Sequence, residues 1–138
     1  MDKESAVESL TDTMAKFTAY IGKRLPKDVK AKLADLRTME TNPLAKSVYD
    51  SMAGNQEAAD KLDRPSCQDT GVIQYFVEAG ARFPLLGELE EILREATAQA
   101  TRMGPLRHNA VETFDEKNTG TNTGTQIPWL DWRIVPEK

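Results

Sequence analysis

Apolar residues recur at steps of three and four along the first 64 residues, the spacing that collects them on one face of an α-helix. The pattern predicts a helix from about residue 4 to 24, a second that ends near residue 39, and a third that starts at Asn42-Pro43. We expect this third helix to break or kink near Gly54-Asn55, with a short turn of helix following to residue 62. The apolar positions that we expect to be buried in this part are Phe17, Ile21, Leu33 and Val48.

After residue 64 the helical repeat gives way to β-branched and aromatic residues. Residues 72–77 (Val-Ile-Gln-Tyr-Phe-Val) predict a strand that is buried on both faces. A fourth helix is predicted from about residue 87 to 103, with Leu89, Ile92 and Leu93 on its buried face and Gly104-Pro105 as its stop. Residues 129–135 alternate between two faces, which predicts a second strand.

The order of these elements predicts an α+β fold. Residues 1–64 form an N-terminal helical layer, and residues 65–138 form a small β-sheet with a packed helix, together making one structural domain. Two strands make at best a marginal sheet, and the second strand carries two tryptophans with no obvious cover. Either another chain completes this sheet, or the sequence is the front part of a longer protein. We therefore expect an incomplete domain of a larger subunit.

Composition and charge exclude several classes of function. The 138 residues carry a net charge of −4, and neither half has the basic excess that binding to a phosphate backbone requires. No run approaches the roughly 20 apolar residues of a membrane-spanning helix, and the polar N-terminus is unlike a secretory signal. The single cysteine excludes a disulfide within the chain. We expect a cytoplasmic protein with no nucleic-acid or membrane partner.

Polar residues crowd into two loops, at residues 64–71 before the first strand and at residues 106–109 after the fourth helix. One cysteine and one histidine exclude a four-ligand zinc site, and no flanking signature supports a nucleophilic pair of Cys67 and His108. From the residues alone, a cysteine such as Cys67 is more often an inert, partly buried small residue than a ligand, and Arg107 more often forms a surface ion pair than binds a substrate carboxylate. The two loops together predict a candidate polar pocket.

Five sequence blocks carry a resemblance to a known family. They are Arg-Pro-Ser-Cys-Gln-Asp-Thr-Gly at 64–71, Phe-Pro-Leu-Leu-Gly-Glu-Leu at 83–89, Pro-Leu-Arg-His-Asn-Ala-Val-Glu at 105–112, the tandem Asn-Thr-Gly-Thr repeat at 118–125, and Pro-Trp at 128–129. In this order they resemble the N-terminal region of the class I, iron–sulfur fumarases and the related L(+)-tartrate dehydratase α-subunits. On the residues alone, the repeat is interpreted as two tandem turns.

The resemblance implies a role for individual residues in the first and third blocks. Cys67 corresponds to one of three cysteine ligands of a [4Fe–4S] cluster, whose open iron binds the substrate. Gln68 and Asp69 correspond to residues that line the substrate pocket, with Asp69 a candidate for proton transfer or for holding the substrate hydroxyl. Arg107 corresponds to an arginine whose planar fork suits a carboxylate. His108 is assigned only to the surroundings of the site, as is its neighbour Asn109.

The resemblance also implies what this chain lacks. The family needs two more cysteines, together with an arginine, lysine and threonine set from the remainder of the subunit and from a β-subunit or second domain. We therefore expect an oligomeric hydro-lyase that dehydrates a 2-hydroxy dicarboxylate, either L-tartrate to oxaloacetate or malate to fumarate and back. This chain alone is expected to be inactive and to hold no cluster. The alternative is a non-catalytic helical interaction module, a truncated paralogue that docks on the intact enzyme.

Overall fold

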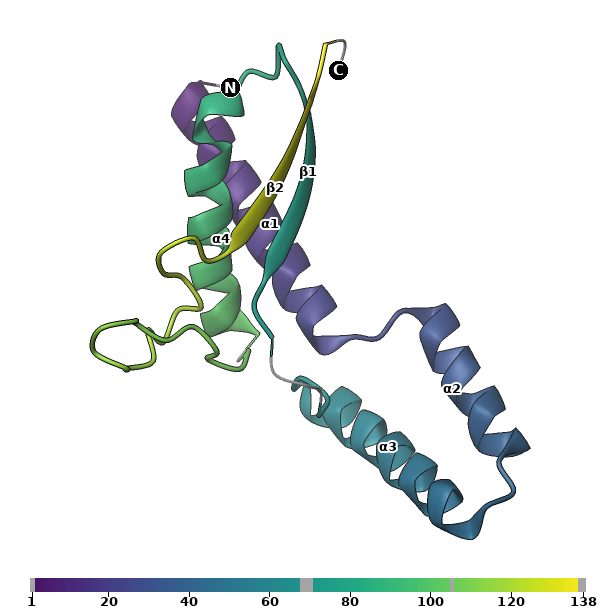
Figure 1. The fold of residues 1–138 in the computed structure, drawn as a ribbon. Helices are drawn as coiled ribbons and strands as arrows, with labels where there is room; N and C mark the ends of the chain where they lie inside the picture. The colour runs from purple at the N-terminus through teal and green to yellow at the C-terminus, as the bar shows by residue number, and fades with distance from the viewer. Residues whose placement is uncertain (1, 68–70, 105, 137–138) are drawn as a thin grey trace. The chain divides into compact units, whose positions relative to one another are not determined.

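The computed structural model describes residues 2–67, 71–104 and 106–136. Along them the elements follow in the order α1 (Lys3–Lys23), α2 (Lys27–Met39), α3 (Pro43–Leu62), β1 (Gln74–Gly80), a 3-10 turn (Leu86–Glu88), α4 (Leu89–Met103) and β2 (Trp129–Val135) (Figure 1). Helices and a small sheet with a helix packed on it confirm the expected α+β class. No helix in this part of the chain has the length and apolar character that crossing a membrane requires.

The chain forms two compact units. Residues 2–19 belong to the first unit together with the described residues from 71 onward, and residues 20–67 belong to the second. The first unit therefore contains most of α1, the sheet and α4, while the second contains α2 and α3. From the change in residue pattern we expect a helical layer that ends at residue 64 and an α/β part that follows it. This division stays a prediction.

The two strands of the first unit run parallel, in register from Gln74 opposite Trp129 to Gly80 opposite Val135. Neighbouring parallel strands need a long crossover connection, and α4 lies within it. Both predicted strands are confirmed, and β2 has the predicted bounds. β1 spans 74–80 instead of 72–77, because its extent is set by the residues that find a partner on β2.

Only one face of β1 is turned toward the helices. The Tyr75 hydroxyl lies 2.8 Å from the Thr18 hydroxyl of α1 and 3.2 Å from the Thr97 hydroxyl of α4. The neighbouring Phe76 points the other way and is 76% exposed. The expectation that this strand is buried on both faces is therefore wrong. Successive strand residues alternate between faces, and the described residues of this unit cover only the face that Tyr75 occupies.

The core of the first unit is built on α4. Leu89, Ile92 and Leu93 are buried as predicted, with Ala96, Thr97, Ala98, Ala100 and Thr101 continuing the buried surface. Gly104 ends this helix at a close approach to α1, where a Cβ atom would lie 3.3 Å from the Ala19 Cβ and 3.0 Å from the Ala100 carbonyl. The glycine therefore allows the two helices to pack tightly at this end.

The buried face of α1 is not the apolar stripe that the sequence suggests. Phe17 and Ile21 are exposed, and so is Val48 of α3, while Leu33 of α2 is half-buried. These three exposed positions correct the prediction of burial. The side chains that α1 does bury are Thr11, Ala15, Thr18 and Ala19. This stripe lies one residue, or about 100°, away from the large apolar stripe, and its small residues let α1 pack close to its neighbours.

In the second unit α3 is one continuous helix. The Asn42 side chain accepts hydrogen bonds from the main-chain N–H groups of Leu44 (2.9 Å) and Ala45 (3.4 Å), which confirms the predicted cap. Of the break or kink predicted near Gly54-Asn55, the break is wrong, because the helix runs without interruption from Pro43 to Leu62. A glycine inside a helix costs only about 0.5–1 kcal/mol relative to alanine, which is too little by itself to interrupt the helix.

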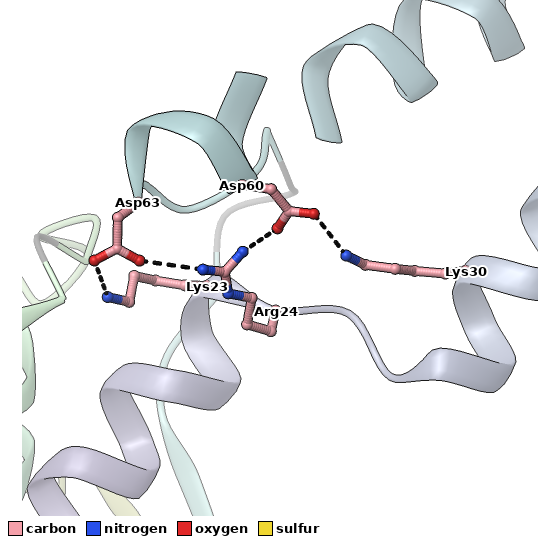
Figure 2. A network of polar contacts seen from close by, with 5 residues as sticks. All are labelled: Lys23, Arg24, Lys30, Asp60 and Asp63. Carbon is pink, nitrogen blue, oxygen red and sulfur yellow. Dashed lines mark hydrogen bonds and ion pairs between the residues drawn. The ribbon is translucent and has the colours of Figure 1, made fainter. Parts of the chain in front are cut away.

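Basic side chains from the end of α1 and from α2 hold the last turn of α3 (Figure 2). Asp60 pairs with Lys30 at 2.9 Å and with Arg24, and Asp63 pairs with Lys23 at 2.9 Å and with Arg24 at 3.3 Å. The hydrogen bonds from Lys30 and then Arg24 lower the pKa of Asp60. The hydrogen bond from Lys23, with its positive charge, lowers the pKa of Asp63. These ion pairs thus connect the end of α1 and the start of α2 to the end of α3 within the second unit.

Candidate functional site

Cys67 lies just beyond α3, at the end of the segment that leaves this helix. The helix ends at Leu62, and the left-handed backbone of the following Asp63 turns the chain away. The main-chain N–H of Cys67 then donates to the Asn55 side-chain oxygen at 2.8 Å. The thiol is free and exposed. Asn55, near the position where a break was expected, therefore ties the cysteine segment back to the helix.

A cavity of about 670 Å³ lies beside Cys67 within the second unit, between α2 and α3. Its walls are mostly apolar, and the polar residues that line it are Ser47, Ser51, Asn55, Gln56 and Ser66, beside Cys67. The apolar lining residues include Leu25, Val29, Leu33, Val48 and Met52.

The second predicted loop is held by the tandem repeat. The Asn122 side chain, only 6% exposed, donates to the Arg107 carbonyl at 2.7 Å and accepts from the Asn109 main-chain N–H at 2.7 Å. Asn118 donates to the carbonyl of His108, and its side-chain oxygen accepts from the Gly120 N–H at 2.9 Å. The two asparagines of the repeat therefore bind three consecutive residues of the Leu-Arg-His-Asn block.

Asn122 is a residue whose role the sequence interpretation missed. Asn118 forms a local turn, as expected of the repeat, but Asn122 reaches across to another loop. The signal available in the sequence was the recurrence of asparagine four residues apart beside a polar block. Nothing in that spacing says which carbonyl group either amide will meet.

The same loop also contacts the end of the Cys-Gln-Asp-Thr-Gly block. The Asn109 side chain donates to the carbonyl of Gly71 at 2.6 Å. Both residues lie in the first compact unit. The last residue of the Cys-Gln-Asp-Thr-Gly motif and the last residue of the Leu-Arg-His-Asn motif are thus neighbours in space.

The remaining predicted site residues are placed only in part. Gln68 and Asp69 lie outside the described residues. Cys67 and Arg107 belong to different compact units, so the common concave surface predicted for them stays a prediction. Arg107 itself is exposed.

The side chains that could bind a metal can be compared with the ligands that an iron–sulfur cluster needs. Within the described ranges no three His, Cys, Asp or Glu side chains are grouped so that they could hold a metal ion. An exposed free thiol is nevertheless the side chain that iron–sulfur clusters take as a ligand. Cys67 thus fits as one ligand of such a cluster, whose other thiolates would have to come from outside this chain, because the chain has a single cysteine.

Comparison with known proteins assigns the chain to a family. Residues 11–138 match the family described as fumarate hydratase (Fumerase), and the chain belongs to it. This confirms the family resemblance that the five sequence blocks indicate.

The following curated relatives are longer than this chain. L(+)-tartrate dehydratase subunit alpha of Escherichia coli strain UTI89 is 53% identical over 136 residues, which are 99% of this chain and 45% of the relative. The corresponding protein of strain K12 is 52% identical with the same coverage. A putative L(+)-tartrate dehydratase subunit alpha of Methanocaldococcus jannaschii is 32% identical over 110 residues, 78% of this chain and 38% of the relative. The chain therefore spans less than half the length of these relatives.

Proposed function

We propose that the complete protein containing this chain is an iron–sulfur hydro-lyase that eliminates water from a 2-hydroxy dicarboxylate. L-tartrate, which would give oxaloacetate, is the first candidate substrate because the relatives at 52–53% identity are named for it. Interconversion of malate and fumarate is the second candidate, since it uses the same elimination on a dicarboxylate of the same length. The observation that carries the proposal is the hydrogen bond from Asn109 to Gly71, which brings the ends of two family motifs together.

Cys67 holds the cluster in this proposal. Its thiol is exposed and in no disulfide, and its main-chain N–H donates to the Asn55 side chain at 2.8 Å, which ties the cysteine segment to α3. When bound, a [4Fe–4S] cluster with one open iron supplies a Lewis acid for the leaving hydroxyl group. Two further thiolates are contributed by other parts of the complete protein.

Arg107 and the two residues after Cys67 handle the substrate. The guanidinium group of Arg107 binds one substrate carboxylate through two parallel hydrogen bonds, a geometry that a lysine ammonium does not reproduce. Gln68 donates to the substrate oxygens. Asp69 either takes the proton that leaves the carbon next to the hydroxyl-bearing carbon or holds the hydroxyl group that departs.

The partners follow from the same proposal. A β-subunit or second domain completes the site with the remainder of the α-subunit, because the relatives are named as α-subunits and extend well beyond this match. The assembly is an oligomer in the cytoplasm, where a lone exposed thiol such as Cys67 is kept reduced and available to iron.

The first test concerns the cysteine. The complete protein and its partner subunit are reconstituted anaerobically with iron and sulfide and assayed on L-tartrate, malate and fumarate. Cys67→Ser is expected to abolish the iron–sulfur absorbance and all three activities together, since a hydroxyl group is a poor ligand for iron. Ser66→Ala, at the adjacent position, is the matched control and is expected to keep both. A Cys67→Ser protein with normal absorbance and activity would refute the proposal.

The second test separates substrate binding from cluster binding. Arg107→Lys is expected to keep the iron–sulfur absorbance while raising KM for the dicarboxylate about tenfold or more, as a point charge replaces a two-pronged contact. Arg102→Lys is the control, because Arg102 is an exposed arginine on α4 that pairs at 3.6 Å with Glu95. Equal KM values for the two variants would remove Arg107 from the substrate site.

A further inference from the structure

The Asn122 side chain connects the candidate substrate loop to the core of the first unit. Its amide nitrogen lies 3.2 Å from the Thr101 hydroxyl of α4 and 2.7 Å from the Arg107 carbonyl. Its oxygen accepts the Asn109 main-chain N–H at 2.7 Å. One buried side chain therefore binds the main chain on both sides of His108 and joins it to a core helix.

The backbone at this position is suited to asparagine. Asn122 has a φ of +57°, in the left-handed region that asparagine tolerates better than most residues. Because the side chain is almost fully buried, its hydrogen bonds are shielded from competing water. Their loss would leave the Arg107 carbonyl and the Asn109 N–H without these partners.

We propose that Asn122 is a positioning residue for Arg107, fixing the main chain from which the guanidinium group reaches the substrate carboxylate. This inference rests on the function proposed above. Asn122 touches no substrate in this account and acts only through residues 107–109. The bond from Asn109 to the Gly71 carbonyl extends the same fixation to the end of the Cys-Gln-Asp-Thr-Gly block.

We expect loss of the Asn122 side chain to weaken substrate binding and to leave cluster binding unchanged. A two-pronged contact tolerates little displacement, and a misplacement of about 1 Å from a change outside the reacting centre can cost on the order of a hundredfold in rate. We therefore expect Asn122→Gly to raise KM for the dicarboxylate roughly ten- to hundredfold while the iron–sulfur absorbance is kept. Glycine is chosen because it adopts a positive φ without strain, so only the side-chain contacts are lost.

A matched control is available in the same loop. Gln126 also has a left-handed backbone, with a φ of +58°, but its side chain is exposed. Gln126→Gly therefore makes the same kind of backbone substitution without removing the buried contacts. We expect it to leave KM and kcat unchanged.

The test combines kinetics with amide hydrogen exchange in the complete protein and its partner subunit. KM and kcat are measured for Asn122→Gly, Arg107→Lys and the double variant, and exchange of the Asn109 amide is followed in the wild type and in Asn122→Gly. If Asn122 acts through Arg107, the double variant is expected to have nearly the KM of Arg107→Lys alone, since the two losses are not additive. Exchange at Asn109 is expected to accelerate at least about tenfold when its acceptor is removed, while α4 stays protected.

Two results overturn the inference while the proposed function stands. One is an active wild type whose Asn122→Gly variant keeps its KM although Asn109 exchanges faster. The other is a double variant whose KM rises by the product of the two single effects, which is the behaviour of a residue with a general structural role. A wild type that neither binds nor converts any of the dicarboxylates refutes the proposed function, and the inference that rests on it falls with it.

Discussion

Leu93 is the core position at which the packing of the first unit is most directly tested. It is 3% exposed on α4, next to the fully buried Ile92. Leu93→Ala removes three carbon atoms, which at about 0.8 kcal/mol for each buried methylene amounts to roughly 2.4 kcal/mol. The cavity left behind adds to this loss, so the free energy of unfolding is expected to fall by about 2–5 kcal/mol. The higher helix propensity of alanine offsets only a few tenths of a kcal/mol.

The assay is urea-induced unfolding of the 138-residue chain, followed by far-ultraviolet circular dichroism. Leu44→Ala serves as the matched control because it makes the same substitution in α3, where Leu44 is 77% exposed. We expect the control to change the free energy of unfolding by less than about 0.5 kcal/mol. Leu93→Met, which nearly conserves volume, is expected to cost less than about 1.5 kcal/mol.

Two results for the free energies of unfolding of these variants would contradict this expectation. If Leu93→Ala costs no more than Leu44→Ala, then Leu93 does not occupy the core position described for it. If Leu93→Met is as destabilising as Leu93→Ala, the site responds to shape and not to the volume removed, and the cavity argument is wrong.

Two further predictions concern the second unit. The pKa values of Asp60 and Asp63 are lowered in the folded state, so their ion pairs stabilise the fold above the ordinary carboxyl value of 3.8 and are lost as the pH falls through the lower folded values. The urea midpoint of unfolding is measured from neutral pH to below pH 3.8. As the pH falls, this midpoint is expected to decrease less steeply in the double variant Asp60→Asn, Asp63→Asn than in the wild type. An equal decrease in both proteins would contradict the pairing. Asn42→Ala removes the cap of α3, and it is expected to lower the free energy of unfolding in urea by about 0.5–2 kcal/mol. Asn42→Asp, which keeps the acceptor oxygen, is its control, and equal losses in the two variants would argue against the cap.

Patterns among neighbouring residues were enough to locate most of the helices and strands and to indicate the family. The 3.6-residue repeat located α1, α2 and α4 to within a few residues, the alternation at 129–135 gave the bounds of β2, and Asn42-Pro43 gave the start of α3. These features are local, because a period, a cap or a turn is written in neighbouring residues. The motif around Cys67 and the one around Arg107 were sufficient to identify the family, since their residue order is specific.

Which surfaces are buried and which loop residues meet depends instead on how the chain folds in space. Phe17 and Ile21 form a regular stripe, yet α1 buries the small-residue face next to it, because burial depends on the element that lies opposite. Phe76 is exposed for the same reason, since the described helices of its unit cover only one face of the sheet. The contact between Asn122 and the Arg107 loop joins residues 15 positions apart through a buried amide. Such a contact depends on the path of the chain in space, which no local pattern specifies.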